Sequence, residues 1–78
     1  MQKQTSKEEL MEVYRDTLHK MAVSTELLEL DGYFGAALEV IRHLSALKLI
    51  NLKEQKEMET TVNVFHWKTS HSILEAEE

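Results

Sequence analysis

Residues 33–49 read YFGAALEVIRHLSALKL and carry an apolar arc that is too wide for a single neighbouring helix to cover. At 3.6 residues per turn, most of the apolar side chains fall on one side of a helix and the rest continue round its flank. The polar remainder is a narrow strip formed by Glu39, Arg42 and His43. We therefore predict a central helix over residues 33–48 that other elements contact from both sides. The residues predicted to form the apolar side are Tyr33, Ala36, Ala37, Val40, Leu44 and Leu47, and those predicted to continue the apolar arc round the flank are Phe34, Leu38 and Ile41.

The preceding segment predicts a first helix over residues 6–30. Ser6 and Glu9 have the spacing of a capping box, and a seam with alternating spacings of three and four residues follows them. We expect Asp31-Gly32 to end this helix, because glycine accepts the left-handed conformation that follows many helices. A short link of this kind makes the first two helices antiparallel neighbours. The seam positions are Met11, Tyr14, Leu18, Met21, Thr25 and Leu28.

The segment after the central helix predicts a third helix over residues 52–74. Asn51 is the expected N-cap, and Glu54 completes a second capping box. The turn before it resembles a connection common in short bacterial helical modules, Leu-x-x-Leu-Gly-Ile-Ile-Thr-x-x-Glu, with Lys48 in the place of the glycine. This resemblance follows from helix capping and implies no family. The predicted core stripe is Met58, Val62, Phe65, Thr69 and Ile73.

Part of the third segment also has the composition of a strand. Residues 60–69 are rich in β-branched and aromatic side chains, which resist helix and favour strand. The alternative is a helix that ends near Glu59, followed by an edge strand that pairs with its copy in another subunit. We favour the continuous helix, because residues 52–59 are strong helix formers and no turn separates the two parts.

These elements predict an all-α fold, a small three-helix bundle in which a third helix packs across an antiparallel helical hairpin. The domain spans residues 6–74, with a disordered N-terminus at residues 1–5 and a frayed acidic tail at residues 75–78. A chain of 78 residues has a marginal core on its own, and the absence of cysteine excludes disulfide support. We therefore expect a homodimer.

The composition limits the cellular compartment and the kinds of partner that the protein can have. With 14 acidic and 9 basic side chains the formal net charge is −5, so phosphate backbones are repelled and no nucleic-acid partner is expected. No run approaches the roughly 20 apolar residues that span a bilayer, and the N-terminus lacks a signal-peptide core, so no membrane partner is expected. The lack of cysteine fits a reducing compartment, and we expect a cytoplasmic protein.

No motif indicates catalysis, a cofactor or a metal. The two glycines, Gly32 and Gly35, form neither a nucleophile elbow nor a phosphate-binding loop. Metal ligands on a helix lie three or four residues apart, whereas His66 and His71 lie five apart. We therefore expect a protein that is not an enzyme.

Surplus apolar side chains indicate a protein interface. On a helix over residues 52–74, Trp67 faces away from the core stripe, and tryptophan is enriched among the residues that dominate interface energy. Two apolar residues of the first segment also fall outside its seam. The predicted interface residues are Trp67, Val64, Leu74, His71, Val23 and Leu27.

We therefore expect a small, acidic, non-catalytic regulatory or adaptor protein that docks through a helix face, with its acidic rim selecting a basic partner. Its size and acidity resemble those of accessory proteins of bacteria and their phages. One alternative is an acidic nucleic-acid mimic that inhibits a DNA-binding protein, although lysines interleave with the glutamates. Another is a structural or accessory subunit of an enzyme complex.

Overall fold

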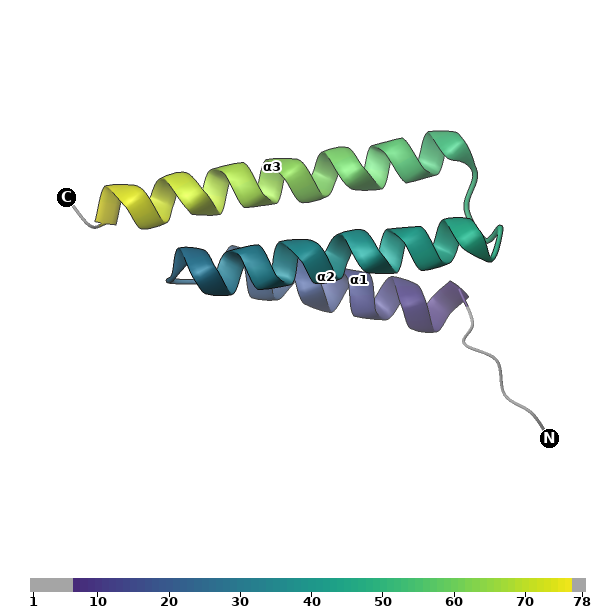
Figure 1. Cartoon of the computed structure of the whole chain (residues 1–78), viewed down its shortest axis with the longest axis horizontal. Helices are drawn as coiled ribbons and strands as arrows, with labels where there is room; N and C mark the ends of the chain where they lie inside the picture. The colour runs from purple at the N-terminus through teal and green to yellow at the C-terminus, as the bar shows by residue number, and fades with distance from the viewer. Residues whose placement is uncertain (1–6, 77–78) are drawn as a thin grey trace.

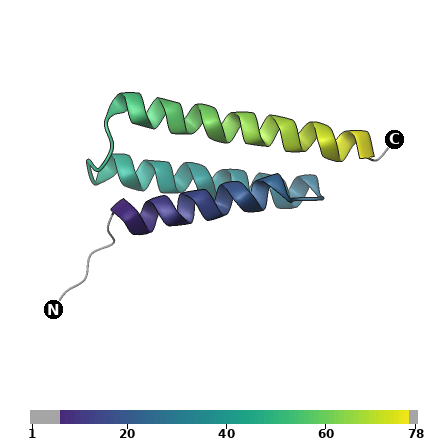
Figure 2. The same cartoon turned by 180° about the vertical axis from the view of Figure 1, so that it is seen from behind.

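The computed structural model describes residues 7–76, which form three α-helices and contain no strand (Figure 1). The helices are α1 (Lys7–Ala22), α2 (Leu27–Ala46) and α3 (Leu52–Ala76). Consecutive helices run in opposite directions, and α2 packs against both α1 and α3 (Figures 1 and 2). Because α1 also contacts α3, the three helices share one core. The predicted all-α three-helix fold is confirmed.

Some predictions concern residues outside the described range. The expected disordered N-terminus at residues 1–5, the proposed cap residue Ser6 and the last two residues of the chain, 77–78, all lie there. At the other end of the described range, Glu75 and Ala76 belong to α3, so this helix runs two residues further than predicted.

The boundary between the first two helices differs from the prediction. The chain leaves α1 after Ala22, and α2 then runs through Asp31-Gly32 without interruption. Gly32 has no positive φ, and a Cβ added to it would meet nothing within 4 Å. The prediction that Asp31-Gly32 ends a helix over residues 6–30 is therefore wrong, because this glycine occupies an ordinary helical position.

The chain turns at Ser24 instead. Its side-chain Oγ donates a hydrogen bond to the main-chain oxygen of Lys20 at 2.7 Å, and its main-chain N–H donates to Met21 at 3.2 Å. A short hydroxyl side chain competes in this way for main-chain groups that would otherwise continue a helix. Two predicted seam residues consequently leave α1: Thr25 lies exposed in the connection, and Leu28 is 86% exposed on α2.

The core is formed by buried apolar side chains from all three helices. Ile41 is fully buried, although the prediction placed it only on the flank of the central helix. The buried side of α2 is therefore turned toward Ile41 relative to the predicted side, which leaves Ala36 exposed. Leu47 is also exposed, because it lies where the chain leaves the helix. The buried apolar residues are Tyr14, Leu18, Met21, Leu30, Ala37, Val40, Ile41, Leu44, Ile50, Val62 and Ile73.

The third helix is continuous over 25 residues, which rules out the strand alternative at residues 60–69. Val62, Thr69 and Ile73 of the predicted stripe are buried, and the other two members, Met58 and Phe65, are partly buried against the core. The β-branched side chains are therefore accommodated because packing of one helix face outweighs intrinsic propensity.

The connection between α2 and α3 is fixed by main-chain hydrogen bonds. Leu49 N–H donates to Leu44 at 2.9 Å and Lys48 N–H donates to Ser45 at 3.0 Å, which is the pattern of a Schellman motif. Lys48 occupies the position where glycine is usual and adopts a left-handed φ of 59°. The chain is thereby turned toward α3.

The start of α3 is capped as predicted. Asn51 and Glu54 exchange two hydrogen bonds, from Asn51 N–H to Glu54 Oε1 at 2.9 Å and from Glu54 N–H to Asn51 Oδ1 at 2.7 Å. This reciprocal capping box confirms the prediction and fixes where the helix begins.

Candidate functional site: the outer face of α3

The side of α3 opposite the core carries exposed apolar side chains. Val64 is 42% exposed, Trp67 is 60% exposed and Leu74 is 47% exposed. His71 is also exposed and lies one helical turn after Trp67, with the two ring centroids 4.4 Å apart and the ring planes tilted by 46°. We call the side of α3 formed by Val64, Trp67, His71 and Leu74 the outer face. The helix therefore places four of the six predicted interface residues together.

The other two predicted interface residues lie elsewhere. Val23 is 60% exposed in the connection between α1 and α2, and Leu27 is 37% exposed at the start of α2. Both are accessible, but neither belongs to the outer face. The chain neighbours of Val23, Ala22 and Ser24, line a groove together with Val64.

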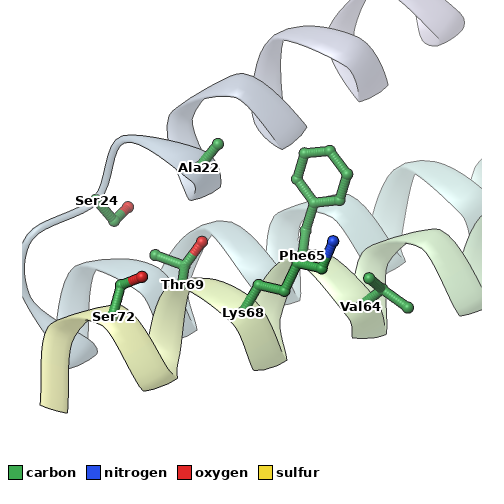
Figure 3. A pocket seen from close by; sticks show the side chains of 7 residues that line it. All are labelled: Ala22, Ser24, Val64, Phe65, Lys68, Thr69 and Ser72. Carbon is green, nitrogen blue, oxygen red and sulfur yellow. The ribbon is translucent and has the colours of Figure 1, made fainter. Parts of the chain in front are cut away.

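This groove lies between the α1–α2 connection and α3 and has a volume of about 350 Å³ (Figure 3). Its wall on α3 combines the apolar side chains of Val64 and Phe65 with two hydroxyl groups, those of Thr69 and Ser72. Lys68 is the one titratable side chain among the lining residues, so the groove contains no acid–base pair. The lining residues are Ala22, Ser24, Val64, Phe65, Lys68, Thr69 and Ser72.

A second, shallower hollow lies on the N-terminal half of α3. It was not predicted, yet a sequence signal for it exists. Lys53, Glu57 and Thr60 precede Val64 with the same alternation of four and three residues that links the members of the outer face. They therefore lie on the same side of the helix. The hollow is lined by Lys53, Lys56, Glu57, Thr60 and Thr61.

His43 and His66 make side-chain contacts within the bundle. The His66 Nε2 lies 3.0 Å from Asp31 Oδ1, and the His66 ring lies 4.5 Å from the ring of Phe34. The His43 ring nitrogen Nδ1 lies 3.2 Å from the main-chain oxygen of Glu39. Over residues 7–76, no three histidine, aspartate or glutamate side chains come close enough together to hold a metal ion.

Within residues 7–76, the phenol of Tyr14 has a shifted pKa. Burial raises the pKa of the Tyr14 phenol, and a hydrogen bond with Thr61 opposes the shift. Tyr14 is a core residue, 6% exposed, so its phenol packs within the fold and is not accessible to a substrate as a base.

None of the described helices is long and apolar enough to cross a membrane. Comparison of the chain with known proteins gives no match to a family model, a curated protein or a solved structure. The described residues thus form a three-helix bundle whose most distinctive surface is the outer face of α3.

Proposed function

We propose that this chain is a small, non-catalytic regulatory or adaptor protein of the cytoplasm that works by protein–protein contact through the outer face of α3. We propose further that it acts as a homodimer. The observation that carries the proposal is the position of Trp67, 60% exposed between Val64 and Leu74 on the side of α3 opposite the core.

An exposed tryptophan of this kind has a large apolar area to gain from burial. At about 25 cal/mol per Å² of apolar surface, covering a large aromatic side chain stabilises a complex by a few kcal/mol. The contact of the Trp67 ring with the tilted His71 ring restricts the indole ring before a partner arrives. Restricting a side chain in advance reduces the entropy lost on binding. Trp67 therefore has the properties of an anchor residue.

The charge of the chain supports two kinds of partner. The net charge of −5 favours a protein with a basic surface. The outer side of α3 itself carries both signs, with Lys53 and Lys56 near its start and Glu75 near its end. A surface with both signs along one helix suits a second copy of the same chain.

The test is the molar mass in solution by light scattering after size exclusion, over a hundredfold dilution. We expect a dimer whose tryptophan emission shifts to the red on dissociation. Trp67→Ala should dissociate the dimer with unchanged helical circular dichroism. Leu28→Ala is the matched control, because Leu28 is 86% exposed and belongs to α2, not to the outer face of α3. It should remain dimeric.

Two results would contradict the proposal. A Trp67→Ala variant that stays dimeric would show that the outer face is not the contact surface. A wild-type chain that is monomeric throughout the dilution, and whose capture of basic proteins is unaffected by Trp67→Ala, would leave the outer face with no role in contact.

A further inference from the structure

We propose that two copies of this chain pair antiparallel along their α3 helices, with Val64 at the two-fold axis and each Trp67 seated in the hollow around Thr60 and Thr61 of the other copy. This inference rests on the proposed self-association and specifies its geometry. Three features of α3 lead to it independently: the charges at its ends, its length and the position of the hollow.

The first feature is a pair of charges at unfavourable ends of the helix. Lys53 lies in the first turn of α3, where the helix dipole is positive, and Glu75 lies in the last turn, where the dipole is negative and no basic residue compensates it. Within residues 7–76 neither side chain has an ion-pair partner. An antiparallel copy brings the start of one α3 beside the end of the other. Both charges then acquire a partner of opposite sign.

This pairing defines a register. Lys53 and Glu75 lie eleven residues before and after Val64, so a two-fold axis at Val64 sets each Lys53 opposite the Glu75 of the copy. The same axis lies at the midpoint of α3, whose ends at Leu52 and Ala76 are each twelve residues away. The two helices therefore overlap over all 25 residues, a length of about 37 Å. No other antiparallel register overlaps as much of α3.

The hollow fits the same register. Trp67 lies three residues after Val64, and Thr60 lies four residues before it on the same side of the helix. The indole ring of one copy is therefore within one residue's rise of Thr60 in the hollow of the other. Glu57 and His71 lie seven residues to either side and also face each other. A single axis at Val64 thus pairs the opposite charges, overlaps the full length of α3 and places Trp67 at the hollow.

The side chains along this surface have the spacing of a coiled-coil seam. Alternating steps of four and three residues let two helices cross at a small angle and interlock. A parallel pair would instead set Lys53 beside Lys53 and Glu75 beside Glu75, with the two helix dipoles aligned. The antiparallel arrangement is therefore favoured. The seam is Lys53, Glu57, Thr60, Val64, Trp67, His71 and Leu74.

The absence of cysteine from the natural chain permits a direct test by oxidation of single-cysteine variants. Val64→Cys should form a disulfide-linked dimer, because the two residues meet at the axis within the reach of a disulfide. Leu74→Cys is the matched control. Leu74 lies ten residues from the axis, so its two copies are separated by roughly 30 Å along the helices and should not cross-link.

Charge exchange provides a second test that leaves the apolar contacts intact. Lys53→Glu and Glu75→Lys should each raise the dissociation constant of the dimer about tenfold, because each replaces two attractive pairs by two repulsive ones. The double variant should recover the wild-type dissociation constant. Circular dichroism of all variants checks that the helices are retained.

The outcomes separate the geometry from the self-association itself. Cross-linking of Val64→Cys alone, with recovery in the charge-exchanged double variant, supports the antiparallel pair. Cross-linking of both cysteine variants indicates a parallel pair and overturns it. A dimer by light scattering in which neither variant cross-links also overturns this geometry while self-association stands. A chain that is monomeric at every concentration overturns both.

Discussion

Tyr14 of α1 donates a hydrogen bond from its Oη to the main-chain oxygen of Met58 in α3, at 3.2 Å and across 44 residues of the chain. The phenol ring is 6% exposed, so one side chain supplies both apolar packing and a directed polar contact between the first and the last helix. This contact fixes the position of α3 relative to α1, and it makes the stability of the bundle sensitive to the ionisation of one group.

Tyr14→Phe should destabilise the fold by about 0.5–1.5 kcal/mol at neutral pH, because a hydrogen bond is lost while the packing is kept. The two proteins should differ less at alkaline pH. Burial raises the pKa of Tyr14 in the folded state, whereas an unfolded tyrosine ionises near pH 10. The stabilising contribution of Tyr14 is therefore complete below about pH 10 and is lost as the pH rises through the raised pKa.

Thermal unfolding followed by circular dichroism between pH 8 and pH 11 measures this effect. The wild-type melting temperature should fall more steeply above about pH 10 than that of Tyr14→Phe. Lysine titration affects both proteins equally and is removed by the comparison. Parallel curves throughout the range would show that the phenol is not the group responsible.

Gly32→Ala should stabilise the bundle by about 0.5–1 kcal/mol, because Gly32 lies inside α2 and a Cβ there would meet nothing within 4 Å. Ala36→Gly is the matched control, since Ala36 is exposed on the same helix and should lose a similar amount. Chemical unfolding of both variants gives the two free energies. A loss of stability in Gly32→Ala would mean that the chain does turn at Asp31-Gly32.

Lys48→Gly should also stabilise the fold, by roughly 0.5–1 kcal/mol, because glycine adopts the left-handed conformation at this position without the steric cost of a Cβ. Lys48→Ala separates conformation from charge, since alanine has a Cβ and no ammonium group. It should leave the free energy of unfolding nearly unchanged. If alanine and glycine gave equal gains in urea unfolding, the lysine charge and not the backbone would be the cause.

Asn51→Ala should destabilise the fold by about 1 kcal/mol, because it removes the acceptor for the Glu54 N–H at the start of α3. Glu54→Ala removes the reciprocal bond to the Asn51 N–H. The double variant should lose less than the two single losses combined, because the two side chains act as one capping unit. Additive losses in a double-mutant cycle would argue against a cooperative box.

Much of the fold follows from local signals in the sequence. The Asn51 and Glu54 side chains cap α3 through contacts three residues apart, and the core stripe of α3 repeats with the helical period, so both were readable without tertiary information. The position of the turn between α1 and α2 could not be predicted from local signals. Glycine at position 32 is a strong local breaker signal, yet packing of Leu30 and Ala37 into the core holds the helix across it.

The candidate site divides in the same way. The outward direction of Trp67 is a consequence of helical periodicity and was predictable. The common register of Lys53, Glu75 and the hollow on α3 could not be predicted. It depends on where α3 begins and ends and on whether residues 60–69 continue as helix. Boundaries of elements are the property that local patterns specify least, and a two-fold axis at Val64 is defined by them.

The brevity of the two connections has a consequence for folding kinetics. Four residues separate α1 from α2, and five separate α2 from α3, so most contacts of the core join segments that are close in sequence. Little loop-closure entropy is lost before these contacts form, and helical domains with such low contact order fold in about microseconds to milliseconds. Each chain can therefore complete its own fold well before it encounters a second molecule at micromolar concentration.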